Sequence, residues 1–173
     1  MRVLGVDPGL VHCGWAVLED GKTIAVGTLV PPAVEKHTIN TTLAYLIPEL
    51  DKIVGQYFPT AAAVEQVAWY GTRKRITLPL SHVAGAIVGL LLARGITTYL
   101  LLANMKTAKV RRRKAWDEHQ YDAVVLAKVI HDYNVAEDAG DNSYLQKRSA
   151  VGQRRIIARP NAHGKRSKRD RAG

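Results

Sequence analysis

Three short apolar runs open the chain, and the way they are joined limits the fold it can adopt. Residues 2–7, 14–19 and 23–29 each have the length and composition of a strand. The Asp-Gly pair at residues 20–21 is a signal for a tight hairpin, which pairs the second and third runs antiparallel. The sequence therefore predicts a sheet at the start of the chain, with an antiparallel hairpin in it.

Helix and strand patterns alternate along the rest of the chain. They predict, in order, a helix from about Thr38 to Tyr57, a strand at 61–67, a helix at about 78–94, a strand at 96–102 and a helix at about 116–133. Pro48 is expected to disturb the first half of the first helix, because proline lacks the amide hydrogen that a helix uses. This order predicts an α/β domain with a mixed five-stranded sheet flanked by helices.

The charge of the chain is unevenly distributed. The formal net charge is +10, and residues 147–173 hold ten basic residues against one acid. Basic clusters at 73–75 and 106–114 leave the remainder acidic, a layout expected when carboxylates hold metal ions and cations hold phosphates. The alternative is that the basic runs are solvated surface. We predict a folded domain over residues 1–135, a flexible basic tail over 136–173, and a polyanion as partner.

Neither a membrane span nor secretion is indicated. The longest nearly apolar stretch, residues 83–93, is too short for a membrane helix, and the start of the chain lacks a secretory signal pattern. Cys13 is the one cysteine, which excludes a disulfide framework within the chain. We therefore expect a soluble, intracellular, cytoplasmic protein.

Four residues of metal-ligand type are expected to meet at one edge of the sheet. Asp7 ends the first strand, and Glu65 is the single acid inside the apolar strand at 61–67. Strand ends are where open α/β sheets bind ligands, and a buried carboxylate is costly unless it is paired or bound to metal. His119 and Asp122 are three residues apart, so they share one face of the last helix. Taken alone, each acid could instead be a capping or hydrogen-bonded structural residue. His119 alone could be a surface histidine or one that is satisfied by structural hydrogen bonds.

The sequence around these residues resembles a known family. GVDPGLVHCGWAVLE is similar to the opening motif of the RuvC-type Holliday junction resolvases, VEQV to their second acidic strand, and HQYDAVVLA to their closing helix. The three motifs stand in the family's order and spacing over about residues 2–133. The resemblance implies an RNase H-like fold and a DNA-associated endonuclease that resolves four-way junctions by paired hydrolysis of phosphodiester bonds.

The resemblance also implies a metal centre. It assigns Asp7, Glu65, His119 and Asp122 as ligands of two Mg²⁺ ions, for which Mn²⁺ can substitute. The third ligand is often Asp in the family and is His here. Lys106, in the string ANMKT, is similar to the family's lysine and is expected near the scissile phosphate or the attacking water. The alternative for Lys106 is a plain contact with the DNA backbone.

Basic and aromatic residues are expected to bind the DNA. A group that follows Glu65 is expected to bind unpaired bases, and a basic loop is expected to bind the DNA backbone. The first group is Trp69, Tyr70, Arg73, Lys74 and Arg75, and the loop residues are Lys109, Arg111, Arg112 and Arg113. The alternative for Trp69 is a place in the core. The family is dimeric through the region of Leu78 to Arg94, so we expect a homodimer there, against the alternative of a helix buried in the monomer.

The chain also departs from the family's pattern in other places. A short basic loop stands where the family has an extra helical segment, and the family's glycine-containing stretch after its lysine is missing. Ala68 occupies the position of an aromatic that helps to open the junction, with Trp69 and Tyr70 next along, and the segment after about residue 135 has no counterpart. These features fit a short phage-type or otherwise divergent member. Two other functions stay open: an RNase H-like nuclease acting on other branched DNA or RNA, and a catalytically silent nucleic-acid-binding homologue. A two-lobed ATPase is excluded because 173 residues are too few.

Overall fold

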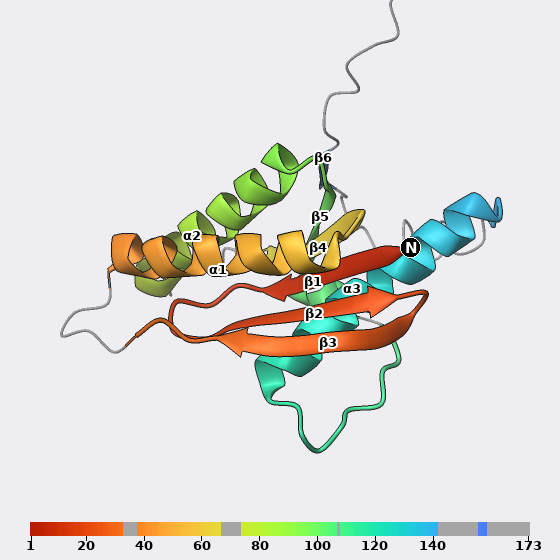
Figure 1. Cartoon of the computed structure of the whole chain (residues 1–173), viewed down its shortest axis with the longest axis horizontal. Helices are drawn as coiled ribbons and strands as arrows, with labels where there is room; N and C mark the ends of the chain where they lie inside the picture. Colours follow the sequence, from red (N-terminus) through yellow and green to blue (C-terminus); the bar gives the residue numbers. More distant parts are fainter. Residues whose placement is uncertain (33–37, 67–73, 107, 142–155, 159–173) are drawn as a thin grey trace, which may run out of the picture.

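A mixed sheet forms the centre of the computed structural model, which describes residues 1–32, 38–66, 74–106, 108–141 and 156–158. The strand order is β3-β2-β1-β4-β5-β6, and α3 packs on one face of the sheet while α1 and α2 pack on the other (Figure 1). The strands are β1 (Arg2–Asp7), β2 (Cys13–Glu19), β3 (Lys22–Leu29), β4 (Ala61–Gln66), β5 (Thr97–Leu102) and β6 (Ile156–Ala158). The helices are α1 (Ile39–Tyr57), α2 (Lys74–Ala93) and α3 (Glu118–Asp138), with a short 3-10 turn, η1 (Ala103–Met105), after β5.

The first three strands form a meander, as predicted. β1 pairs antiparallel with β2, and β2 pairs antiparallel with β3. At the hairpin, Asp20 has φ 48° and Gly21 has φ 77°, so both residues adopt the left-handed conformation that a tight two-residue turn requires. The β1–β4 and β4–β5 pairs are parallel, which brings the carboxyl ends of β1, β4 and β5 to one edge of the sheet. Asp7 and Glu65 lie at that edge.

The five predicted strands are confirmed, and the sheet has one strand more than the prediction. β6 pairs antiparallel with β5 and comes from the segment that was expected to be a flexible tail. The pair Ile156-Ile157 is shorter than the apolar run of four to eight residues by which a strand is recognised, so the pattern did not identify it. The division of the chain at residue 135 stays a prediction, and α3 continues beyond that residue to Asp138.

The helices differ from the predictions mainly at their ends. α1 begins after the N-cap Thr38 and is continuous through Pro48, because buried Leu46 and Leu50 on either side fasten it to the core. α2 begins at Lys74, ahead of the predicted start, and includes Pro79. None of the helices in the described ranges is long and apolar enough to cross a membrane.

Candidate active site

Three carboxylates meet at the carboxyl edge of the sheet. Asp7 is the last residue of β1, Glu65 lies near the end of β4, and Asp122 lies in the second turn of α3. One carboxylate oxygen from each lies within 4.8 Å of those of the other two. Asp7 is buried, whereas Glu65 and Asp122 are half-buried. The structure therefore brings together the three acids that the sequence placed in one site.

His119 joins this group through Asp7. It lies one turn before Asp122 on α3, and its Nδ1 is 2.8 Å from Oδ2 of Asp7. The side chain of His119 is 42% exposed, against 12% for Asp7, so the imidazole forms the open rim of the cluster. The role of His119 as a metal ligand stays a prediction.

Lys106 inserts its ammonium group between two of the acids. Its Nζ lies 2.8 Å from Oε2 of Glu65 and 2.5 Å from Oδ2 of Asp122. Burial alone would lower the pKa of Lys106, but the hydrogen bonds to Asp122 and Glu65 outweigh it and raise that pKa above its ordinary value. Lys106 is therefore a fixed positive charge inside the acidic cluster.

Asp7 carries the strongest electrostatic perturbation of the cluster. Burial and a hydrogen bond with Glu65 raise the pKa of Asp7 from 3.8 to about 7, although His119 and Lys106 act in the opposite direction. A third full negative charge is thus unfavourable in this site without additional positive charge. A divalent cation would supply that charge, and hard carboxylate oxygens are the ligands that Mg²⁺ prefers. The donor set therefore fits a divalent metal ion.

Two glycines allow α3 to approach the sheet closely enough to complete the site. A Cβ atom on Gly5 of β1 would lie 2.0 Å from the backbone oxygen of Ala123. One on Gly14 of β2 would lie 2.2 Å from the backbone oxygen of His119. Any side chain at these two positions would push α3 away from the sheet. The absence of side chains there sets the distance between Asp122 and Asp7.

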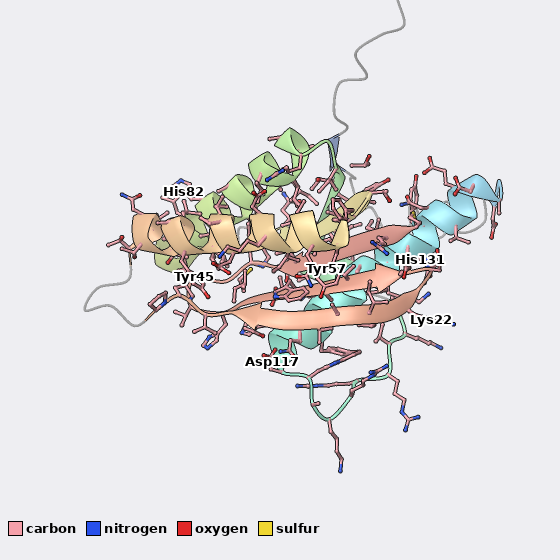
Figure 2. The ribbon with its side chains drawn as sticks, in the orientation of Figure 1. Lys22, Tyr45, Tyr57, His82, Asp117 and His131 are labelled. Atoms are coloured by element: carbon pink, nitrogen blue, oxygen red, sulfur yellow. The ribbon has the colours of Figure 1, made fainter. Side chains whose placement is uncertain are left out.

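The N-terminus of α3 is also tied to the edge strand β3. The N-cap Asp117 lies at the start of α3 (Figure 2). It accepts a hydrogen bond from the backbone of Gln120 with Oδ1 and one from the hydroxyl of Thr28 with Oδ2, at 2.7 and 2.5 Å. Burial would raise the pKa of Asp117, but the bonds from Thr28 and Gln120 lower it overall. Gln120 also donates to Thr28 from its side-chain amide. This network fixes the first turn of α3, on which His119 lies.

The sequence of the chain matches the model of one known family. The family model described as "Crossover junction endodeoxyribonuclease RuvC" matches residues 3–141. The chain belongs to the RuvC family. The resemblance in the three sequence motifs is thereby confirmed.

Curated members of the RuvC family share about a third of the aligned residues. The RuvC of Rickettsia prowazekii (strain Madrid E) is 35% identical over 95 residues, covering 53% of this chain and 59% of that protein. The RuvC of Caulobacter vibrioides (strain ATCC 19089 / CIP 103742 / CB 15) is 37% identical over 102 residues, with the same coverage. The chain thus spans 59% of the length of these relatives.

Solved RuvC structures share the fold. The structure of "T. thermophilus RuvC in complex with Holliday junction substrate" superimposes with a TM-score of 0.66 over 82% of this chain and 97% of that chain, at 16% identity. A second structure of Thermus thermophilus RuvC gives a TM-score of 0.65 over 79% of this chain and 97% of that chain, at 16% identity. The predicted RNase H-like α/β fold is confirmed.

The basic loop of this RuvC-family chain lies between η1 and α3 and projects below β3 (Figure 1). The guanidinium carbon of Arg112 lies 5.6 Å from the ring centre of Tyr121, and that of Arg113 lies 5.2 Å from the ring centre of Trp116. Cation–π contacts thus hold these two arginines at the start of α3. Lys109 and Arg111, also predicted to bind DNA, have exposed side chains.

The other predicted DNA-binding group falls outside the part of the chain that the structure describes. Trp69, Tyr70 and Arg73 lie within residues 67–73. Lys74 and Arg75 are the first two residues of α2, but their side chains do not belong to the part of the chain that the structure describes. Their contribution to DNA binding stays a prediction.

One residue beside the acidic cluster was not predicted from the sequence. The ring of His12, in the loop between β1 and β2, stacks on that of His119, with the two ring centres 5.7 Å apart and the ring planes 9° from parallel. The signal was present as a histidine five residues after Asp7, inside the opening motif. The sequence alone did not show that this loop turns back toward the N-terminus of α3.

Proposed function

We propose that this RuvC-family chain is a structure-selective endodeoxyribonuclease that resolves four-way DNA junctions by paired, Mg²⁺-dependent hydrolysis of phosphodiester bonds. The observation that carries the proposal is the cluster of Asp7, Glu65 and Asp122 around the ammonium group of Lys106. The curated relatives are named as crossover junction endodeoxyribonucleases, and one similar structure is described as bound to a Holliday junction substrate. Both findings support the same activity here.

The metal centre is the finer part of this proposal. Two Mg²⁺ ions, or Mn²⁺ in their place, would supply an activated water and stabilisation of the leaving oxygen. Asp7 is proposed as the shared ligand, with Glu65 and Asp122 each completing the coordination of one ion. His119 would add an imidazole ligand or accept a proton, and imidazole favours Mn²⁺ more than an all-carboxylate site does.

Lys106 is proposed to exchange its partners when substrate binds. Its ammonium group now neutralises part of the charge on Glu65 and Asp122. When these acids take a cation, the ammonium group can instead bind the scissile phosphate or orient the attacking water. The four-carbon stem of lysine allows this shift without movement of the backbone.

DNA binding is proposed for the basic loop and for the group at residues 69–75. Arg112 and Arg113 are held by aromatic rings, so less side-chain entropy is lost when their guanidinium groups bind phosphates. We propose residues 1–135 as the nuclease domain. Residues 136–173 are proposed as a basic segment that adds salt-dependent affinity regardless of DNA sequence.

Homodimerisation is proposed through α2. The helix buries Val83, Ile87 and Leu91 against the sheet, while Gly85 and Gly89 are exposed on its other side. A Cβ atom on either glycine would meet nothing within 4 Å, so a second backbone can approach there. A hollow of about 230 Å³ lies beside this face, lined by Gln66, Ser81, Ala84, Gly85, Val88 and Leu100.

Gly89→Leu is expected to weaken the dimer by about fivefold or more, because a large side chain on the contact face prevents close approach and overpacking costs about 1–3 kcal/mol. Sedimentation equilibrium would measure the dissociation constant. Gly55→Leu is the matched control, since Gly55 is an exposed glycine of α1 with nothing within 4 Å of a Cβ atom. A Gly89→Leu protein that dimerises as tightly as the wild type would place the interface elsewhere.

The test of the proposed function is a panel of synthetic substrates: a mobile four-way junction, a fork, a flap, linear duplex DNA and structured RNA. With Mg²⁺ or Mn²⁺, we expect paired symmetric nicks in the junction and no cleavage of linear duplex. Preferred cleavage of the fork, flap or RNA would favour a nuclease for another branched substrate. Binding of the junction without cleavage would indicate a catalytically silent homologue.

A further inference from the structure

The parallel rings of His12 and His119 come from two segments that are far apart in the sequence. His12 belongs to the loop that follows Asp7, and His119 belongs to the first turn of α3. Their ring centres are 5.7 Å apart and the planes differ by 9°. This separation lies within the range at which offset aromatic rings attract one another. The exposed side of His119 is thus partly covered by a second imidazole.

The orientation of His119 needs such a contact. The imidazole is 42% exposed and has a hydrogen bond from or to Asp7 at one ring nitrogen, Nδ1, 2.8 Å from Oδ2. One hydrogen bond to a half-exposed ring leaves it free to turn about that bond. A flat group parallel to the ring removes this freedom. His12 is the flat group in that position.

The backbone that carries His12 is held on both sides. The backbone oxygen of Leu10 accepts a hydrogen bond from the hydroxyl of buried Thr42 on α1, at 3.2 Å. Cys13, the next residue after His12, is 1% exposed and pairs with Leu29 of β3. The backbone at His12 is therefore held in place, although the side chain of His12 is exposed.

We propose that His12 is a positioning residue that acts through His119. Its ring keeps the imidazole of His119 in the orientation that directs Nδ1 to Asp7 and leaves Nε2 for a metal ion or a proton. The consequence for cleavage rests on the proposed function, whereas the orientation of His119 does not. Without the ring of His12, His119 samples other orientations and the acidic cluster loses a prearranged imidazole.

The direct test uses the full-length chain without metal or DNA. The ¹³C–¹H order parameter of the His119 ring, measured by NMR, is expected to be lower in His12→Ala than in the wild type and to fall below about 0.6, the range of flexible groups. His12→Phe retains a flat ring and is expected to restore the wild-type value. Equal order parameters in wild type and His12→Ala would overturn the proposal, as would a His12→Phe protein that behaves like His12→Ala.

A kinetic test separates positioning from DNA contact. His12→Ala is expected to lower kcat for junction cleavage by about threefold to tenfold, the effect of losing one ring pair, with KM unchanged. His12→Phe is expected to recover kcat. A rise in KM alone in His12→Ala would mean that His12 contacts the DNA and would overturn the proposal. If neither the wild type nor any variant cleaves a junction, the proposed function is wrong. The NMR result then still decides the role of His12.

Discussion

Asp7→Asn is expected to abolish cleavage of four-way junctions while leaving junction binding intact. Asp7 is the most buried of the three acids and lies within reach of both Glu65 and His119. An amide of the same size keeps the packing but replaces a carboxylate ligand with a neutral group. We expect the single-turnover rate with Mg²⁺ to fall at least about 10³-fold, the upper range for loss of one charge-stabilising group. Binding measured with Ca²⁺ in place of Mg²⁺ should stay within about threefold of wild type.

Asp20→Asn is the matched control for this substitution. It makes the same chemical change in the β2–β3 hairpin, at the other end of the sheet, and asparagine tolerates the left-handed conformation of Asp20. Its cleavage rate is expected to equal that of the wild type. Rapid cleavage by Asp7→Asn would show that the metal assignment is wrong, whereas loss of junction binding would point to a structural role for Asp7.

The same variant has a second expected property, which follows from the electrostatics of the site. Burial and Glu65 raise the pKa of Asp7 from 3.8 to about 7, so the folded chain binds the proton more tightly than the unfolded chain. Without divalent ions, the contribution of Asp7 to wild-type stability therefore falls as the pH rises from about 4 to about 7. Asparagine does not ionise, so Asp7→Asn should melt at a higher temperature than wild type at pH 8. The two melting temperatures should converge near pH 4, and added Mg²⁺ should raise only that of the wild type.

The parts of this site that follow from local patterns were predictable from the sequence. Asp7 could be placed because it ends a strand and Pro-Gly follows it at once, so the chain turns there and the carboxylate stands at the sheet edge. Glu65 was conspicuous as a lone acid in an apolar strand, and the three-residue spacing of His119 and Asp122 put both on one helix face. These inferences needed only strand ends and helix periodicity. The structure brings the three acids together in one cluster and places His119 in contact with Asp7.

The parts that depend on contacts between distant segments were not predictable. The stacking of His12 on His119 requires the β1–β2 loop to reach α3, and the network of Thr28, Asp117 and Gln120 requires the first turn of α3 to lie beside β3. Hydrophobic periodicity describes the faces of a single helix or strand and contains no information about contacts between elements that are distant in the sequence. β6 was missed for a different reason, because its strand is set by pairing with β5 and not by its own composition.

Gly5 makes another contact between distant segments that the sequence does not reveal, and its substitution is expected to cost a large free energy of folding. In the sequence it is one residue inside an apolar strand, with no sign of a special role. In the structure α3 crosses β1 so closely that a Cβ atom on Gly5 would lie 2.0 Å from the backbone oxygen of Ala123 and 2.9 Å from the backbone nitrogen of Ala127. Both atoms belong to a helix backbone and cannot turn aside as a side chain can. An added methyl group must therefore displace α3 as a whole.

Gly5→Ala is expected to destabilise the folded chain by about 3 kcal/mol or more, the upper range for overpacking, as measured by urea unfolding. The fraction that folds is expected to cleave junctions about 10²-fold more slowly, because α3 carries His119 and Asp122 and a displacement near 1 Å has that effect on a positioned site. Gly55→Ala is the control, since Gly55 lies inside α1 with nothing within 4 Å of a Cβ atom, and alanine there should stabilise the chain by about 0.5–1 kcal/mol. If both alanine variants were equally stable and active, α3 would not be seated on Gly5, and the close packing that brings Asp122 to Asp7 would be wrong.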